Sequence, residues 1–156
     1  MKVMIKWILI LAVAYGVLRW FEWSQLYIPS RDVYATPESA GLEYEDVTLV
    51  TEDDRRIHAW WIPHPSARGT VIVCHGNAGT IADRLWIAAD LHIFRVNVLL
   101  FDYRGYGKSS GIPTERGTYR DARAAYEYAR LKHGESDDPP IIVYGRSLGG
   151  AVAAHL

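Results

Sequence analysis

The chain has 156 residues, of which 49% are hydrophobic and 22% are charged, a composition typical of one globular domain. With 17 basic and 18 acidic residues the formal charge is −1, which excludes a strong field that would attract nucleic acid. The single cysteine, Cys74, has no second cysteine to pair with. It is therefore predicted to be a small buried hydrophobic residue rather than part of a disulfide or a metal site.

The first segment, residues 1–28, is assigned to a membrane rather than to the globular domain. The stretch from Val3 to Phe21 carries only two charged residues, Lys6 and Arg19, whose long side chains can extend to the lipid headgroups. These two are separated by about 20 Å of helix at ~1.5 Å per residue, short of a ~30 Å hydrocarbon core, so a single marginal span is predicted. Aromatic residues expected at the two membrane interfaces are Trp7, Trp20, Trp23 and Tyr27.

A cleaved signal peptide is the alternative interpretation of this segment. Lys2 and Lys6 would be its charged start and Ala12–Ala14 its cleavage site, but only Trp7–Leu11 would remain as the apolar core, which is too short. An uncleaved signal-anchor is therefore favoured, and the lack of a polar face argues against a core helix of the domain. Two lysines precede the span and only Arg19 follows it, so the domain is expected on the non-cytoplasmic side of the membrane by a thin margin.

The rest of the chain alternates between strand-like and helix-like segments. Residues 29–43 are rich in turn-forming residues and predict a connector. Two segments of alternating polarity around Glu52–Asp54 predict an antiparallel pair at the edge of the sheet, because prolines follow the pair. Strands are then predicted at Thr70–Cys74, Val96–Phe101 and Ile141–Tyr144, and helices at Ile81–Phe94 and Thr118–Lys132. The order indicates an α/β domain over residues 44–156 with a mostly parallel sheet.

The first of these helices is predicted from the spacing of its apolar residues. Its apolar residues at roughly helical spacing are Leu85, Trp86, Ala88, Ala89 and Ile93.

A serine between glycines follows the last predicted strand. The segment Gly145-Arg146-Ser147-Leu148-Gly149 fits the pattern G-x-S-x-G, in which the serine lies on a strained turn from a strand to a helix. The glycines keep side chains out of a turn where the two backbones nearly touch. The first N–H groups of the helix lie at the positive end of its dipole, which suits a developing oxyanion. An ordinary glycine-rich turn with Ser147 as a helix cap is the alternative.

Two further motifs at strand ends make the chain similar to the α/β-hydrolase superfamily. His75-Gly76-Asn77-Ala78-Gly79 follows the first apolar strand, and Phe101-Asp102-Tyr103-Arg104-Gly105-Tyr106-Gly107-Lys108-Ser109 follows the second. Together with the serine motif they stand in the order of that superfamily. The resemblance extends over about residues 40 to 156. Within the superfamily the chain is most similar to the single-span, membrane-anchored hydrolases of serine aminopeptidase-like or dienelactone hydrolase-like type.

The resemblance implies a nucleophile and an oxyanion hole. Ser147 would attack an acyl carbon and form an acyl-enzyme. The backbone N–H groups of Leu148 and Asn77 would stabilise the oxyanion.

The other motif residues are implied to have structural roles. His75 and Gly76 would shape the loop after the first apolar strand, and Gly145 and Gly149 would shape the serine turn. Asp102 would organise its loop rather than serve as the acid of the triad, because the acid follows the nucleophile in this superfamily.

The acid and the base of the triad are absent from this chain. The nine residues after Ser147 include no carboxylate, and His155 lies about 12 Å along the same helix at ~1.5 Å per residue, beyond the ~3 Å that proton transfer requires. The earlier histidines are interpreted as solvated or packed: His58, His64, His92 and His133. The strand Ile141–Tyr144 should be central in its sheet, yet no partner follows it. We therefore expect the N-terminal half of a longer hydrolase, inactive by itself.

The sequence thus predicts a serine hydrolase that cleaves an ester, thioester or amide bond and requires no metal and no organic cofactor. Its partners would be a small-molecule or acyl substrate and, through the N-terminal helix, a membrane, with no nucleic acid. The alternative is a non-catalytic, membrane-anchored binding module on the same scaffold. A nucleotide-binding α/β protein is disfavoured because no phosphate-binding glycine motif follows any strand.

Overall fold

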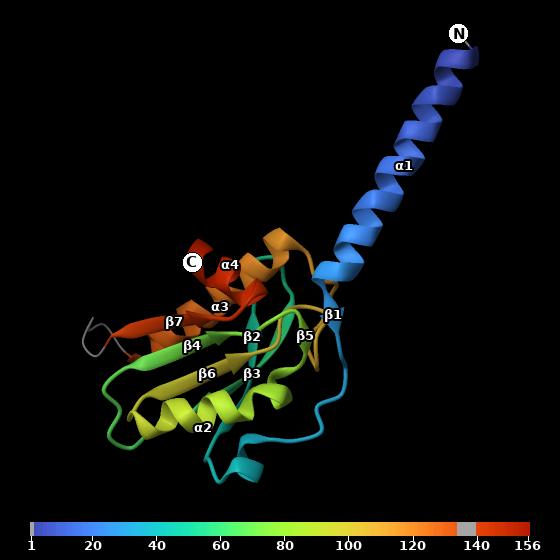
Figure 1. Ribbon diagram of the computed structural model, residues 1–156. Coiled ribbons are helices and arrows are strands. Elements are labelled where there is room, and N and C mark those ends of the chain that lie inside the picture. The colour runs from blue at the N-terminus through green and yellow to red at the C-terminus, as the bar shows by residue number, and fades with distance from the viewer. Residues whose placement is uncertain (1, 134–139) are drawn as a thin grey trace.

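A computed structural model of the chain describes residues 2–133 and 140–156. Within these residues a long helix, α1 (Lys2–Leu26), precedes a domain in which helices cover both faces of a five-stranded sheet (Figure 1). The strands of this sheet are β2 (Glu45–Val50), β3 (Arg56–Ile62), β4 (Thr70–Cys74), β6 (Asn97–Phe101) and β7 (Ile141–Gly145). The helices are α2 (Leu85–Ile93), α3 (Glu115–His133) and α4 (Leu148–His155), with short 3-10 helices η1 (Pro37–Ala40) and η2 (Ile81–Arg84). Two short strands, β1 (Ile28–Pro29) and β5 (Ala78–Gly79), pair separately.

The spatial order of the main sheet is β2-β3-β6-β4-β7. The pairs β2–β3 and β3–β6 are antiparallel, whereas β4 pairs in parallel with both β6 and β7. The predicted α/β domain with antiparallel N-terminal strands is therefore confirmed. One detail of the prediction is wrong, because of this antiparallel pair only β2 lies at the edge and β3 is an interior strand.

Side chains of the inner strands alternate between two hydrophobic cores, one on each face of the sheet, as a period of two requires. The α3-side core combines helix residues such as Ala125 and Val152 with the strand residues Ile57, Ala59, Trp61, Ile72, Cys74, Leu99 and Phe101. The α2-side core combines Leu85, Ile87 and Ala88 of α2 with the strand residues Trp60, Ile62, Val71, Val73, Val98 and Leu100. This covering of both faces explains why the inner strands read as continuous apolar runs.

Helix α2 buries only part of the apolar residues from which it was predicted. Leu85, Ile87 and Ala88 are buried, whereas Trp86 is 53% and Ile93 is 78% exposed. The 3-10 turn η2 precedes α2, and in it the Thr80 side chain accepts a hydrogen bond from the N–H of Ala82. Apolar side chains occur on the exposed face of α2 as well as on its buried face.

Strand β7 is only half covered, in contrast to the prediction of a buried strand. Ile141 and Val143 pack against the α3-side core, but Ile142 is 50% and Tyr144 is 38% exposed. In the described part of the chain β7 pairs with β4 alone, so it lies at the edge of the sheet and beyond the cover of α2. One edge of this apolar strand is therefore unpaired within the described residues.

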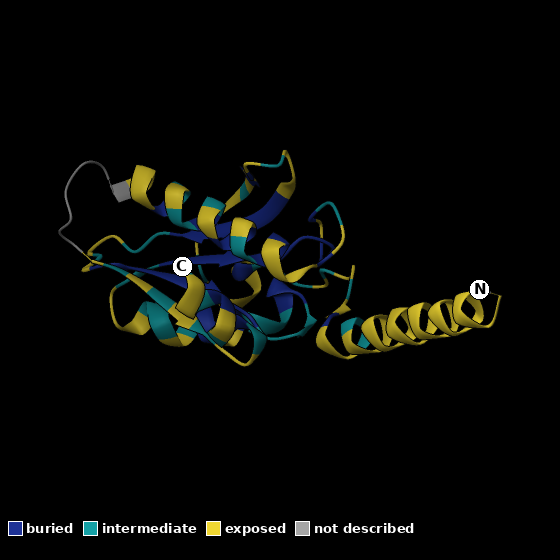
Figure 2. Ribbon diagram, turned by 90° about the horizontal axis from the view of Figure 1, so that it is seen from above, coloured by how far each residue is buried: buried dark blue, intermediate teal, exposed yellow. Residues whose placement is uncertain are grey.

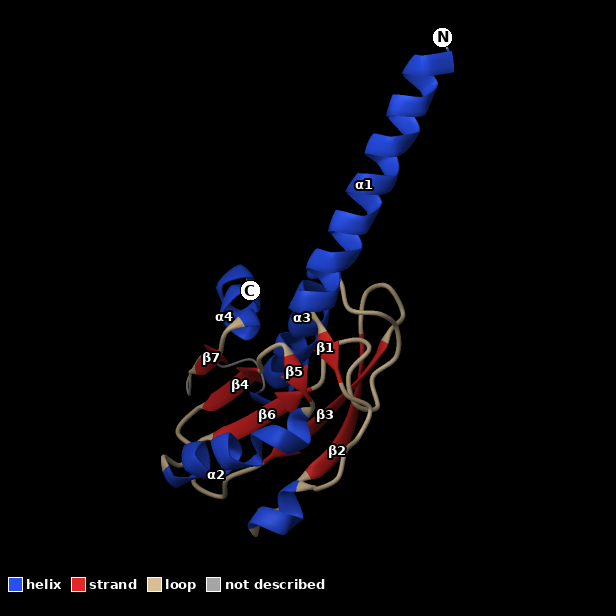
Figure 3. Cartoon of the chain, turned by 45° about the vertical axis from the view of Figure 1, so that its right-hand side comes forward, coloured by secondary structure: helices blue, strands red, loops and turns tan. Residues whose placement is uncertain are grey.

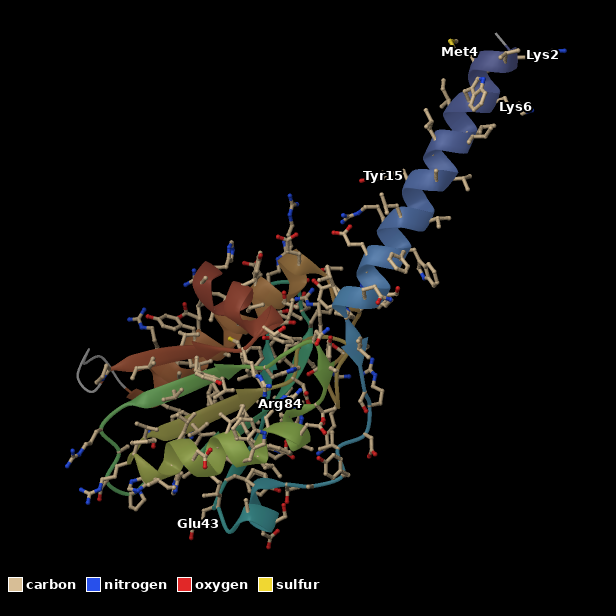
Figure 4. The ribbon with its side chains drawn as sticks, viewed as in Figure 1. Lys2, Met4, Lys6, Tyr15, Glu43 and Arg84 are labelled. Atoms are coloured by element: carbon tan, nitrogen blue, oxygen red, sulfur yellow. The ribbon has the colours of Figure 1, made fainter. Side chains whose placement is uncertain are left out.

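Helix α1 extends away from the domain, and nearly all of its residues are exposed (Figure 2). It is long and apolar enough to cross a membrane. Figure 4 shows the side chains of Lys2, Lys6 and Tyr15 projecting from the helix at a distance from the domain.

The end of α1 nevertheless belongs to the domain. The indole N–H of Trp23 donates a hydrogen bond to the carbonyl oxygen of Pro113 at 2.8 Å, and Tyr27 is 6% exposed within the α3-side core. Trp23 lies in the last turn of α1 and Tyr27 follows the helix directly, with ring centroids separated by 6.2 Å. The prediction that Tyr27 lies among lipid headgroups is therefore wrong, because its side chain is buried in the domain.

Residues 29–43 also contact the domain along their length. Val33, Ala35 and Leu42 pack against the α2-side core.

Candidate active site

The turn between β7 and α4 holds Ser147 in a rare backbone conformation. Its dihedral angles are φ 54° and ψ −120°, and within the described residues only Asp54 and Arg95 are other non-glycine residues with positive φ. A residue with a Cβ atom is strained there, and such strain persists only where the surroundings fix the backbone. The Arg146 N–H donates to the Cys74 carbonyl oxygen at 3.2 Å, which attaches the turn to the end of β4. Ser147 itself is exposed.

Two glycines allow α4 to approach the sheet this closely. A Cβ atom on Gly145 would overlap the carbonyl group of Gly149 in the first turn of α4. A Cβ atom on Gly149 would overlap the carbonyl group of Cys74 at the end of β4. A Cβ atom on Gly150, in contrast, would meet nothing nearer than the Gly145 carbonyl oxygen at 3.8 Å. The crowded positions are therefore those that the motif reserves for glycine.

The loop after β4 lies directly beside Ser147. A Cβ atom on Gly76 would lie 3.6 Å from the Arg146 carbonyl oxygen and 3.9 Å from the Ser147 Cβ atom. In residues 2–133 and 140–156 the backbone N–H groups of Asn77 and Leu148 donate no hydrogen bond. The turn therefore combines an exposed hydroxyl group with two free backbone donors on neighbouring segments.

His75 faces the interior rather than Ser147. Its ring is buried, its Nδ1 atom lies 2.7 Å from the Gly76 carbonyl oxygen, and its Nε2 atom lies 3.8 Å from Oδ1 of Asp102. Burial lowers the pKa of His75 below its ordinary value, against the opposing effect of the Asp102 charge. A neutral ring can donate from Nδ1 to Gly76, so this side chain ties down the loop that passes Ser147.

Asp102 is fully buried and serves as a hydrogen-bond acceptor between segments. Its Oδ1 atom accepts from the Ile81 N–H at 2.9 Å, and its Oδ2 atom lies 3.5 Å from Nδ1 of His58. The carboxylate thus joins the start of η2 to strand β3. A Cβ atom on Gly107 would overlap it, so the 102–111 loop closes tightly over this group.

The remaining histidines lie away from the serine turn or stack on other rings. His155 stacks on Tyr119 with centroids 3.7 Å apart, and the rings of His64 and His92 lie 4.6 Å apart. His133 ends α3, and its side chain lies outside the described part of the structure. Within the described residues no group of three His, Cys, Asp or Glu side chains could hold a metal ion.

Two features of this region were not found from the sequence. Arg104 is buried between two carboxylates, with Nη1 2.8 Å from Asp53 and Nη2 2.9 Å from Asp121, and it holds the pKa of Asp53 well below its usual range. The Tyr106 hydroxyl donates to the Asn77 carbonyl oxygen at 2.8 Å. Both pairings join residues far apart in the chain, and no local pattern reveals them.

A mixed sheet with antiparallel first strands, a glycine-flanked serine after the fifth strand, and a glycine loop beside it define an α/β hydrolase. The model of the family described as "Serine aminopeptidase, S33" matches residues 65–156. The chain belongs to this family.

Relatives and solved structures agree with this assignment. An uncharacterized protein of Mycobacterium tuberculosis is 44% identical over 152 residues, which cover 92% of this chain and 53% of that protein. An uncharacterized membrane protein of Saccharomyces cerevisiae is 35% identical over 136 residues, which cover 86% of this chain and 46% of that protein. The structure of the Pyrococcus furiosus esterase Pf2001 superimposes with a TM-score of 0.69 at 31% identity, covering 82% of this chain and 49% of the esterase. The chain thus spans about half the length of the curated relatives it matches.

Proposed function

We propose that this chain is part of a serine hydrolase that forms an acyl-enzyme on Ser147. The main support is the Ser147 backbone, because φ 54° and ψ −120° at an exposed strand-to-helix turn is a strained conformation that an ordinary helix cap does not need. The α/β-hydrolase family and the likeness to an esterase structure support hydrolytic chemistry. The bond cleaved would be an ester, thioester or amide.

The proposed reaction begins with attack of the Ser147 oxygen on the carbonyl carbon of the substrate. The carbonyl π electrons move to its oxygen, which accepts hydrogen bonds from the Asn77 and Leu148 N–H groups. The tetrahedral intermediate then expels an alcohol, thiol or amine, which takes up the proton that left Ser147. Water hydrolyses the acyl-enzyme in a second round of the same steps. Loss of one such oxyanion donor costs about 10² to 10³ in kcat in enzymes of this kind.

A base must carry that proton, and none of the described histidines is suitably placed. His75 is buried and bonded to Gly76, and His155 stacks on Tyr119. We propose that the acid and the base of the triad come from residues that follow Leu156 in the complete protein. By itself the 156-residue chain would then retain an unactivated serine, with proton transfer worth ~10² to 10⁴ in rate missing.

We further propose that α1 is a membrane anchor, with the domain on the non-cytoplasmic side. The length and apolarity of α1 support the anchor, as does the label of the yeast relative as a membrane protein. The excess of lysine before the span supports the orientation.

Labelling by a fluorophosphonate probe tests the nucleophile in the complete protein. We expect the probe to modify Ser147, identified by mass spectrometry of the peptide, and Ser147→Ala to abolish the modification. Ser66→Ala is the matched control, because Ser66 is exposed and distant in the chain from the turn. Labelling that survives Ser147→Ala would overturn the assignment. A complete protein that binds acyl ligands without labelling or turnover would instead be the non-catalytic binding module.

A further inference from the structure

The segment that leaves α1 lies against the loop that carries Asn77. Strands β1 and β5 pair in parallel beside the base of α1 (Figure 3), with Ile28 opposite Ala78 and Pro29 opposite Gly79. The Ile28 N–H donates a hydrogen bond to the Asn77 carbonyl oxygen at 2.9 Å. The membrane-proximal end of the chain therefore contacts the residue proposed to donate to the oxyanion.

The same carbonyl oxygen accepts a second hydrogen bond from inside the domain. The Tyr106 hydroxyl lies 2.8 Å from it, and Tyr106 is fully buried. Burial raises the pKa of Tyr106, so its hydroxyl group stays protonated and available as a donor. The Asn77 carbonyl group is thus held from two directions, by β1 and by the 102–111 loop.

Further hydrogen bonds attach the same segment to that loop. The Ser30 carbonyl oxygen accepts from the Gly107 N–H at 2.8 Å, and Nη1 of Arg31 donates to the Ser109 carbonyl oxygen at 2.6 Å. Upstream, the Trp23 indole group bonds to Pro113. Residues 23–31 therefore bridge the start of α3, the 102–111 loop and the 75–79 loop, which is more than a passive connection requires.

The orientation of the Asn77 peptide groups matters because an oxyanion donor works only over a narrow range of positions. Donors must lie ~2.7 to 3.1 Å from the oxyanion, and a catalytic group displaced by ~0.5 Å loses much of its effect. The 75–79 loop contains three glycines or alanines and few side chains of its own to fix it. His75 fixes the start of the loop through Gly76, and contacts from outside the loop add order around Asn77.

We propose that β1, with the last turn of α1, and Tyr106 are positioning elements that hold the Asn77 N–H in place for the substrate oxygen. This inference rests on the proposed function. The anchor segment would then be a structural part of the active site rather than only an attachment to the membrane.

Two substitutions test the proposal in the complete protein reconstituted in lipid nanodiscs, one that removes a backbone donor and one that removes a side-chain donor. Ile28→Pro removes the N–H that bonds to Asn77, whereas Ile28→Ala keeps it and removes only an exposed side chain. Tyr106→Phe removes the hydroxyl group and keeps the buried ring, and it serves if Ile28→Pro fails to fold. Tyr34→Phe is its control, because the exposed Tyr34 hydroxyl bonds only to Asp83.

The kinetic readout separates positioning from binding. We expect kcat for a short p-nitrophenyl ester to fall about three- to tenfold in Ile28→Pro and in Tyr106→Phe, as the loss of one hydrogen bond implies, with KM changed by less than about twofold. Affinity for an arylboronic acid, which forms a tetrahedral adduct on serine, should fall by the same factor. Tyr34→Phe should match the wild type. A rise in KM alone, or unchanged kcat in both variants, would overturn the proposal.

Amide hydrogen exchange gives an answer that does not depend on activity. Peptides that contain residues 76–80 should exchange faster in Ile28→Pro than in Ile28→Ala, with the peptides of β4 and β6 unchanged. Equal exchange in the two variants would show that β1 does not order the loop. Absence of turnover and of Ser147 labelling in the wild type would refute the proposed function, while the exchange comparison would still decide the positioning role.

Discussion

Strands β4 and β7 are neighbours with similar sequences and different surroundings. Both are short, apolar and rich in β-branched residues, and they pair in parallel from Thr70 opposite Ile141 to Cys74 opposite Gly145. All five residues of β4 are buried, whereas β7 alternates between half-buried and exposed residues. The difference follows from position, because β4 has a strand on each side and β7 has one. Apolar composition therefore predicts a strand but not the number of its neighbours.

The residues that follow the two strands differ in the same way. After β4 the chain turns His75 into the interior, where the ring contacts Tyr103 with centroids 4.4 Å apart. After β7 the chain turns Ser147 outward on a strained residue. The end of β4 thus supports the candidate site through His75, and the end of β7 presents Ser147, the candidate nucleophile.

The largest expected effect comes from the contact between the first turn of α4 and the end of β4. Gly149→Ala would place a Cβ atom onto the carbonyl group of Cys74, and backbone atoms cannot move aside as a side chain can. We expect a loss of about 4 kcal/mol or more in the free energy of unfolding, measured by urea titration of the complete protein in detergent. Gly150→Ala is the control, since its Cβ atom has room, and it should stabilise α4 by about 1 kcal/mol. Similar effects of the two changes would contradict the close approach of α4 to β4.

A smaller effect should distinguish the two strands themselves. Ile72→Ala in β4 removes a fully buried side chain and should cost about 2 to 5 kcal/mol of unfolding free energy. Ile142→Ala in β7 removes a half-exposed one and should cost less than about 1 kcal/mol, measured in the same way. A large cost at Ile142 in the complete protein would show that a further segment covers this face of β7.

The smallest effect concerns pH and the buried ring of His75. Because its pKa is lowered in the folded protein, the unfolded state binds more protons below the ordinary value of 6.5. Stability should therefore be fully present above pH 6.5 and decline as the pH falls below it, by at most ~1.4 kcal/mol per pH unit for this group. Unfolding at pH 7.5 and pH 5.5 measures the decline.

The contribution of His75 can be separated from that of other groups. His75→Gln should reduce the difference between the unfolding free energies at the two pH values. If the unfolding free energy of His75→Gln still differs as much between pH 7.5 and pH 5.5, other titratable groups cause the pH dependence.

Much of the fold could be predicted from local pattern. The strands Thr70–Cys74 and Ile141–Tyr144 match β4 and β7 within one residue, because apolar runs between turn-forming residues leave little choice. The buried face of α2 could not be predicted from composition, since apolar residues occur on both its buried and its exposed face. The place of Tyr27 in the core also escaped prediction, because its core neighbours belong to segments far from it in the chain.

For the candidate site, the sequence motif predicted the turn and the residues around it but not what supports them. The glycine spacing around Ser147 follows from sterics that act within five residues. The hydrogen bonds to Asn77 come from Ile28 and Tyr106, which precede and follow it by dozens of residues. Only the folded chain brings these three together, so single-sequence patterns carry no signal for them.

The direct passage from α1 into β1 has a consequence for where such a hydrolase could work. Helix α1 ends at Leu26 and β1 begins at Ile28, so one residue separates the proposed anchor from the domain. A flexible tether would let the active site sweep a shell of solvent whose radius grows with tether length. Here the reach is almost zero, and an anchored chain would hold its site at one height above the bilayer. Lengthening the junction between α1 and β1 would therefore widen the range of heights above the bilayer that the site can reach.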